Sequence, residues 1–323
     1  MGALQQAIER ELAGLTPQDL SRARGDLSAR YQVAHQVTPY MGSSWERLSY
    51  LATRMPATFA AVCSALKRML ERLPEAEVQI ETLLDLGSGP GTALWAAVEL
   101  LQTLREATLC ERDGQLIQLG QRLLSHEPSF ERLRVTWQQQ NLAVGAKLPQ
   151  ADLVMASYVL GELPEAEWQA IAMEAWRVTG RFLLFVEPGT PAGFLRIRQL
   201  RKRMLEEGAY IVAPCTHCEG CPMSESDWCH FAAPVARSSL HRQLKQGTLG
   251  HEEEKYSYVV FSKEPISYGG YRIVHSPQKR SGHVHVTLCG AEGLVTTVVS
   301  KRHKEVYQQV RRADWGDRVE ILP

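Results

Sequence analysis

The chain has 323 residues, of which 44% are hydrophobic and 22% are charged, and its 36 Lys and Arg balance 36 Asp and Glu. This ordinary composition excludes the disordered and collagen-like classes, and no apolar run approaches the roughly 18 residues that a membrane span needs. The first residues, MGALQQAIEREL, lack the apolar core of a signal peptide and the acid-poor composition of a transit peptide. We therefore expect a cytoplasmic protein without membrane contact, and we expect it to be a monomer.

Residues 1–77 are predicted to form a helical N-terminal extension, because their apolar residues recur at helical spacing. From residue 78 the pattern changes to short apolar runs that alternate with helical stretches. Such alternation is typical of an α/β fold in which helices cover both faces of a parallel sheet. The expected strands and helices of this part are, in turn, residues 80–86, 107–111, 133–139, 151–157 and 181–187, and residues 92–104, 114–125 and 165–179.

A basic helix is expected at residues 194–208, and a strand at residues 255–263 is expected to complete the main sheet. Three further apolar runs indicate a small β unit near the C-terminus. The predicted organisation is a helical extension at 1–77, a core at 78–265 with a Cys-rich insertion at 210–232, and a basic C-terminal β unit at 266–323.

A glycine-rich loop joins the first expected strand to the first expected helix, in LLDLGSGPGT. Glycines at such a junction allow a tight turn and bring the backbone close to a ligand at the positive end of a helix. Glu111 lies twenty residues past Gly91, at the end of the second strand, where a carboxylate can accept hydrogen bonds from both ribose hydroxyls of a nucleoside. The spacing is G-x-G-x-G and differs from the G-x-G-x-x-G of dinucleotide sites, so no pyrophosphate need be bound.

The segment resembles the class I S-adenosylmethionine-dependent methyltransferases, and the core is therefore expected to have their Rossmann-like fold. In that family the acidic residue before the loop orients the loop and the methionine amine, the second carboxylate holds the ribose, and a residue after the third strand lies near the adenine. The cofactor-binding residues implied by the resemblance are Asp85, Gly87, Ser88, Gly89, Gly91, Glu111 and Asn141.

No catalytic residue is identified by the sequence. The fourth expected strand ends where such enzymes keep catalytic groups, but the Asn-Pro-Pro-Tyr type of motif for amino-group methylation is absent there. Ser157 and Tyr158 are expected to line the pocket, and Glu162 and Glu187 are further polar side chains near strand ends. Nothing marks any of the four as a base.

Four cysteines fall within residues 215–229, and a cluster of this kind in a reducing compartment indicates a metal site more than disulfides. Cys215, Cys218 and Cys221 have C-x2-C-x2-C spacing, which resembles the ferredoxin run that holds a cubane iron–sulfur cluster. A tetrahedral zinc site is the alternative, and His217 and His230 could then also serve as ligands. Local spacing would make Cys229 the fourth ligand in either site.

A closer resemblance joins these features. LLDLGSGPGT, VLGEL, FVEPGTPAGF, a Cys-rich segment ending in WCHF, KYSYVVFSK and a late LCG resemble the methyltransferase-like small-ribosomal-subunit protein family, and the chain looks like a bacterial-type member. Mitochondrial members are assembly factors or components of the small subunit. The family implies a [4Fe–4S] cluster held by four cysteines, and the matching positions are Cys215, Cys221, Cys229 and Cys289. This set places the distant Cys289 where local spacing alone would place Cys218.

The second half of the chain is basic: residues 193–323 hold 19 Lys and Arg against 14 Asp and Glu, whereas residues 1–192 hold 17 against 22. Cations release counterions from phosphates, and interleaved aromatic residues can stack on unpaired bases. The basic runs contain Arg196, Arg198, Arg201, Lys202, Arg203, Lys279, Arg280, Lys301, Arg302, Lys304, Arg311 and Arg312, with Tyr307 and Trp315 among the last of them. Together with the resemblance, these runs predict that the protein acts on small-subunit ribosomal RNA during ribosome assembly.

Two functional classes are left open by the residues. In one, the protein binds S-adenosylmethionine and methylates a base of this RNA. In the other, the pocket is retained in a catalytically inactive RNA-binding assembly factor, in which the iron–sulfur or zinc site is a structural brace.

Overall fold

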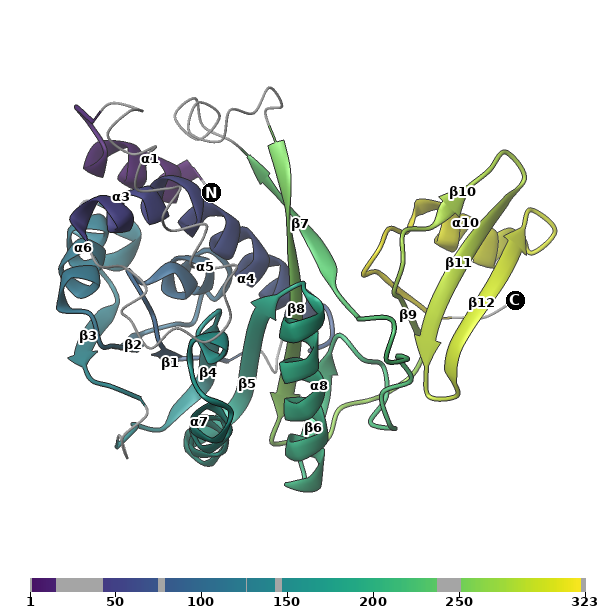
Figure 1. The fold of residues 1–323 in the computed structure, drawn as a ribbon. Coiled ribbons are helices and arrows are strands. Elements are labelled where there is room, and N and C mark those ends of the chain that lie inside the picture. The colour runs from purple at the N-terminus through teal and green to yellow at the C-terminus, as the bar shows by residue number, and fades with distance from the viewer. Residues whose placement is uncertain are drawn as a thin grey trace.

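The structure is a computed structural model that describes residues 2–15, 43–74, 79–125, 127–142, 147–236 and 251–320. Residues 16–42, which belong to the predicted helical extension, lie outside the described ranges. None of the helices in these ranges combines the length and the apolar character that crossing a membrane requires. Two sheets organise the described chain, and the Cys-rich segment lies between them (Figure 1).

The larger sheet has eight strands, and its main path runs in the order β3-β2-β1-β4-β5-β8-β6, with β7 paired to β8. Strands β1 to β5 pair in parallel, whereas β8 is antiparallel to β5 and β6. The strands are β1 (Thr82–Leu86), β2 (Glu106–Glu111), β3 (Arg134–Gln139), β4 (Ala151–Ser157), β5 (Thr179–Pro188), β6 (Tyr210–Ala213), β7 (Phe231–Ala236) and β8 (His251–Ser262). This order and connectivity confirm the predicted Rossmann-like core of class I methyltransferases.

Helices cover both faces of this sheet, as the alternating pattern predicts (Figure 1). One apolar core contains α4, α5 and α6, and the other contains α7 and α8. Pro56 stands in the first turn of α4, where its missing N–H leaves no intrahelical bond unmade. The helices are α1 (Gly2–Glu11), α3 (Ser44–Thr53), α4 (Met55–Leu70), α5 (Thr92–Leu100), α6 (Gly114–Leu124), α7 (Glu165–Val178) and α8 (Pro191–Glu206), with short 3-10 turns at Pro128–Phe130 and Leu160–Glu162.

The smaller sheet packs around a separate apolar core near the C-terminus. In it β11 pairs with β12 along its full length, and with β9 and β10 on its other edge. Its elements are β9 (Tyr271–Ile273), β10 (Gln278–Lys279), β11 (His283–Gly290), β12 (Gly293–Ser300), α10 (Lys304–Arg312) and β13 (Arg318–Val319). Helix α10 was not expected from the sequence, because its nine residues lie within a run of basic and polar residues; Val310 is buried and Val306 and Tyr307 pack on the same core at helical spacing.

Candidate functional site

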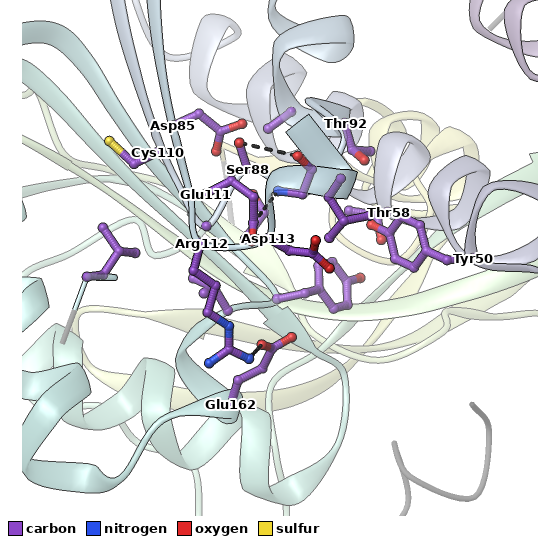
Figure 2. A pocket seen from close by; sticks show the side chains of 18 of the residues that line it. Tyr50, Thr58, Asp85, Ser88, Thr92, Cys110, Glu111, Arg112, Asp113 and Glu162 are labelled. Carbon is purple, nitrogen blue, oxygen red and sulfur yellow. Dashed lines mark hydrogen bonds and ion pairs between the residues drawn. The ribbon is translucent and has the colours of Figure 1, made fainter. Parts of the chain in front are cut away.

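The order of the parallel strands reverses between β1 and β4, and ligands of open α/β sheets bind outside the carboxyl ends of strands at such a point. A cavity of about 540 Å³ lies there. Its wall combines the loop after β1, the ends of β2 and β4, and side chains of α3 and α4 (Figure 2). The sequence-predicted residues in this wall are Asp85, Gly87, Ser88, Gly89, Glu111, Asn141, Ser157, Tyr158 and Glu162.

Glu111 links the glycine loop to the end of β2. Its Oε2 accepts a hydrogen bond from the N–H of Gly89 at 2.9 Å, and its Oε1 accepts one from the N–H of Asp113 at 2.8 Å. Burial raises the pKa of Glu111, and these backbone donors act in the opposite direction. Each carboxylate oxygen keeps a further lone pair, so Glu111 can still accept hydrogen bonds from two hydroxyl groups of a ligand.

Asp85 ends β1 beneath the loop and is only 1% exposed. Its Oδ2 has no hydrogen-bond partner among the described residues. Burial, and then the negative charge of Glu111, raise the pKa of Asp85 to about 7. A buried carboxylate oxygen without a donor is costly, and a cationic or N–H-bearing ligand group would relieve this cost.

The glycines divide into two roles. Gly89 has φ +54°, and a side chain there would extend from the loop into open space, with only the Tyr50 hydroxyl 4.0 Å away. Gly91 does not contribute to the cavity wall; it begins α5 with φ +83°, and a Cβ at this position would lie 3.3 Å from both Leu109 and Trp137. Gly91 is therefore needed for close packing of the loop, whereas Gly89 leaves room for a ligand.

The sequence did not reveal that α3 and α4 close one side of the cavity. Arg47 of α3 donates through Nη2 and Nε to Oδ2 of Asp113 at 2.8 and 2.9 Å, and its Nη1 donates to Gln115 at 2.7 Å. Tyr50 and Arg54 line the same side. The helical pattern predicted these helices, but pattern alone does not state which polar side chains of a helix reach a neighbouring loop.

Directly after β4, the side chain of Tyr158 is held by a hydrogen bond. Tyr158 has φ +59°, an uncommon conformation for a residue with a side chain, and its hydroxyl donates to Oε1 of Glu254 at 3.1 Å. Arg54 lies 3.5 Å from the same carboxylate oxygen. The buried Oγ of Ser157 has no partner among the described residues. The phenol is thus held by a carboxylate from β8, a partner that is almost one hundred residues away in the sequence.

Two further carboxylates near the strand ends are paired with arginines. Glu162 lies 3.6 Å from Arg112 at the cavity rim, where the two side chains point toward one another (Figure 2). Burial raises the pKa of Glu162 to about 8. Glu187 is fully buried, accepts from Nε of Arg196 at 2.7 Å and lies outside the cavity wall. Glu187 therefore serves the packing of α8 against β5 and does not face the cavity.

The Cys-rich segment and β11 meet between the two sheets. Burial raises the pKa of Cys289 to about 12, and the nearby thiols of Cys215 and Cys221 add to this rise. Burial likewise raises the pKa of Cys229, with further contributions from Cys215, Cys289 and Cys221. Cys218 points elsewhere, since its Sγ lies 2.8 Å from the hydroxyl of Tyr268. Cys221, Cys229 and Cys289 pack in one small core, whereas Cys215 and Cys218 both pack against the core of the larger sheet. Cys215 is nonetheless close enough to Cys229 and Cys289 to raise the pKa of both.

Apolar side chains surround these thiols. Phe194, Met223 and Val274 form a small core with Cys289, against which Cys221, Cys229 and Trp228 pack. Phe231, which follows the Cys-rich segment, does not belong to this small core; it packs in the core of the larger sheet against Tyr256 and Tyr258. Among the residues that the structure describes, no three His, Cys, Asp or Glu side chains converge closely enough to hold a single metal ion.

The two histidines of the segment differ in their surroundings. Nε2 of His217 lies 3.6 Å from Sγ of Cys289, and the His217 side chain is 3% exposed. His230 stacks on Trp228 and contacts Trp315 edge to face at 4.6 Å. Only His217 therefore lies beside a thiol of the group.

The basic runs are less exposed than the sequence suggested. Arg201 is 5% exposed and bonds to carbonyls of the Cys-rich segment, and Arg196 is paired with the buried Glu187. At the far end of the smaller sheet, hydrogen bonds of Arg280 N to His283 O and of Lys301 N to Gly282 O bring two turns together at 2.9 and 3.1 Å. The exposed cations at this end, called the basic edge below, are Arg280, Lys301, Arg302, Lys304 and Arg311.

Two proteins of known name are similar to this chain in sequence. The human protein named ribosome assembly protein METTL17, mitochondrial, is 30% identical over 330 residues, which cover 94% of this chain and 70% of that protein. Rsm22-cox11 tandem protein 2, mitochondrial, of Schizosaccharomyces pombe is 25% identical over 362 residues, which cover 96% of this chain and 46% of that protein. The chain thus spans about half the length of the fission yeast relative.

Solved methyltransferase structures are similar to this chain at low sequence identity. Magnesium protoporphyrin IX methyltransferase from Synechocystis PCC 6803 with bound SAM matches with a TM-score of 0.42 and 13% identity, over 78% of this chain and 99% of that chain. The methyltransferase domain of bacterial CtHen1 matches with a TM-score of 0.43 and 13% identity, over 64% and 99%.

The expected location in a bacterial-type cytoplasm is wrong, because the relatives above carry the word mitochondrial in their names and so does the matching family. The expectation was based on composition and on the first residues of the chain, and neither of them identifies the compartment of a protein. The family match extends over residues 44–320 and is described as mitochondrial small ribosomal subunit Rsm22. The chain therefore belongs to the Rsm22 family.

Proposed function

We propose that the protein is a ribosome assembly protein of the small subunit that binds S-adenosylmethionine at the switch point, holds a thiolate metal centre between its two sheets and contacts ribosomal RNA. One observation carries the cofactor assignment: the glycine loop places two buried carboxylates, Asp85 and Glu111, around a cavity, and one of their oxygens has no partner among the described residues. Small-subunit assembly comes from the family and from the name of the human relative.

The cavity suits the chemical groups of this cofactor. Its methionine ammonium would give the orphan Oδ2 of Asp85 a donor and a charge partner, and its ribose hydroxyls would use the remaining lone pairs of Glu111. Asn141 lies in the wall beyond β3, where it can meet the base. When bound, the cofactor supplies an electrophilic methyl group; the residues of this chain bind and orient it.

A binding role of the cofactor is favoured over methyl transfer. The phenol at the end of β4 is held by Glu254, and Glu162 at the rim is paired with Arg112. Neither group stands ready to remove a proton. We infer that the cofactor stabilises the sheet edge and α3 in the form that engages the ribosomal subunit.

One observation favours methyl transfer as the second candidate. Tyr158 is held in the left-handed region at the mouth of the cavity, and strained residues persist mainly where a function requires them. Mass spectrometry of small-subunit rRNA from cells with and without the gene separates the two. A modification that disappears, and returns with the wild-type gene but not with Gly89→Asp, would establish methyl transfer; unchanged rRNA together with stalled small subunits is the expected result.

For the metal centre we propose a [4Fe–4S] cluster on Cys215, Cys221, Cys229 and Cys289. Zinc needs four donors at about 2.0–2.3 Å from one point, whereas each thiolate of a cubane binds its own iron and the sulfurs stand farther apart. The thiols raise one another's pKa but do not converge on one point among the described residues, and this arrangement suits a cubane cluster better than a single zinc ion. The apolar shell of Phe194, Met223 and Trp228 would restrict the access of water.

Paired serine variants test this ligand set. Cys289→Ser is expected to abolish iron and sulfide uptake by the full chain under anaerobic reconstitution, because it removes one of four thiolates. Cys218→Ser, the matched control in the same loop, is expected to retain the full iron content and the broad absorbance near roughly 400 nm that accompanies a cubane. Loss of iron in the control with retention in Cys289→Ser would move the ligand to Cys218, and a colourless protein with bound zinc would replace the cluster.

For RNA we propose the basic edge as the contact surface, because its cations are exposed at one end of the smaller sheet. Replacing both Lys301 and Arg302 with alanine is expected to lower the slope of log K against log salt for small-subunit rRNA by about 1.4–1.8, as about 0.7–0.9 is lost for each phosphate contact. Arg132→Ala, on an exposed turn of the larger unit, serves as the control and should leave the slope unchanged. Equal slopes for all three proteins would place the RNA elsewhere.

A further inference from the structure

Two arginines are buried beside the four thiols. Arg201 of α8 is 5% exposed, and Arg272 of β9 is 2% exposed and belongs to the largest fully buried side chains of the described chain. Burying a guanidinium costs several kcal/mol unless a negative charge compensates it. Neither forms an ion pair with any carboxylate that the structure describes. Both donate to backbone carbonyls, and Arg201 also lies within hydrogen-bonding reach of the Cys215 thiol.

Those carbonyls fix both arginines to the cysteine loop. Nη2 of Arg201 donates to the carbonyl of His217 at 3.3 Å and to that of Glu219, so that the guanidinium lies against residues 215–221. The Nε of the same side chain has no acceptor among the described residues. A buried N–H of a charged group is thus left without a partner next to the thiols, although a native structure normally satisfies such donors.

Arg272 approaches from the opposite side. Its Nε donates to the carbonyl of Pro214 at 2.7 Å, directly before Cys215, and its Nη1 donates to the carbonyl of Gly316 at 2.7 Å. In the β9–β11 ladder Arg272 stands directly across from Cys289, and directly paired residues of antiparallel strands project on the same face.

We propose that Arg201 and Arg272 are the built-in counter-charges of the thiolate metal centre. The inference rests on the proposed function, because it requires four thiolates that bind a metal group. An oxidised cubane core carries two positive charges and its four thiolates carry four negative ones, so the assembled centre has two excess negative charges; a zinc ion on four thiolates has the same excess. Two guanidiniums neutralise this charge, one from α8 beside the larger sheet and one from β9 of the smaller sheet.

This pairing explains why two positive charges are buried without an ion pair to any carboxylate in the described part of the chain. It also implies that the metal-free and metal-loaded proteins respond differently to loss of an arginine charge. Without metal, the thiols are neutral and each guanidinium is an uncompensated buried charge. With metal, the same guanidinium faces an anionic centre, and a nearby positive charge raises the reduction potential of such a centre.

The test uses the full chain reconstituted anaerobically with iron and sulfide, in the variants Arg272→Gln, Arg272→Lys and Arg201→Gln. Arg68→Gln is the matched control, since Arg68 also bridges the two units but does so through Asp317 at 2.6 Å. The reduction potential, the rate of iron release to a chelator, and thermal unfolding of loaded and metal-free protein are measured. None of these depends on activity.

We expect both glutamine variants to shift the reduced-to-oxidised equilibrium at least tenfold toward the oxidised form, which is about 59 mV more negative for one electron, and to release iron at least tenfold faster. Arg272→Lys, which keeps the charge but loses the forked hydrogen bonds, should restore most of the potential. The metal-free glutamine variants should be no less stable than the metal-free wild type.

Other outcomes separate the inference from the proposal beneath it. A wild-type protein that binds a cluster, with potentials in the glutamine variants equal to that of Arg68→Gln, would overturn the counter-charge assignment alone. If the glutamine and lysine variants lower the thermal stability of the loaded and the metal-free protein by the same amount, the arginines contribute hydrogen bonds and not charge. A wild-type protein that takes up neither iron nor zinc would overturn the metal centre and the counter-charges together.

Discussion

Replacing Asp85 with asparagine is expected to stabilise the empty protein and to weaken cofactor binding. Burial and Glu111 raise the pKa of Asp85 from 3.8 to about 7. Between these values the folded protein retains a proton that the unfolded chain releases, so stability falls as the pH rises through this window and the full cost is present above about pH 7. Asparagine removes the ionisable group and with it this cost.

The size of the effect follows from the two pKa values. A rise from 3.8 to about 7, at about 1.36 kcal/mol for each unit, corresponds to about 4 kcal/mol. Because the effective dielectric constant is about 20 even at buried sites, we expect Asp85→Asn to add only about 1–3 kcal/mol to the free energy of unfolding at pH 8. The difference from wild type should shrink as the pH falls toward 4.

Urea unfolding at pH 5 and pH 8 measures this difference, and calorimetric titration with S-adenosylhomocysteine measures binding at pH 8. The variant should bind at least tenfold more weakly, since it cannot neutralise the ammonium of the ligand. Asp152→Asn on the neighbouring strand is the control: its Oδ2 already accepts from Thr82 Oγ1 and from two backbone N–H groups, so this substitution should destabilise the protein. An Asp85→Asn protein that is less stable at pH 8, or that binds as wild type does, would refute the reasoning.

Two further substitutions probe the same cavity. Gly89→Ala should cost about 1–2 kcal/mol of stability, because φ of +54° disfavours a Cβ, and should also weaken cofactor binding; calorimetry and urea unfolding report the two effects, and an unchanged stability would contradict the strain. Arg47→Ala removes the paired contacts to Asp113 and should weaken S-adenosylhomocysteine binding severalfold with little effect on iron content, whereas a loss of iron with unchanged binding would show that α3 serves the metal centre instead.

The local signals in the sequence were sufficient for the core. Alternating apolar runs predicted strands at β1 to β5 and β8, and the glycine spacing with Asp85 and Glu111 predicted residues that line the cavity at the switch point. These features are short in range, since a strand, a turn and a helix start are each specified within a few residues. The antiparallel edge was only partly predicted, because β6 has only four residues and β7 contains Pro234, which weakens the signal of a strand.

The sequence by itself thus determined the order of elements, the glycine loop and the candidate thiols. Only the tertiary structure decided that β11 places Cys289 beside His217 of the Cys-rich segment, that the Cys218 thiol contacts the Tyr268 hydroxyl, that Arg201 is buried, and that α3 closes one side of the cavity. These outcomes depend on which faces meet when two sheets and a loop pack together. Contacts between residues more than seventy positions apart leave no periodic trace in a single sequence, and for that reason the charges around the thiols emerged only from the fold.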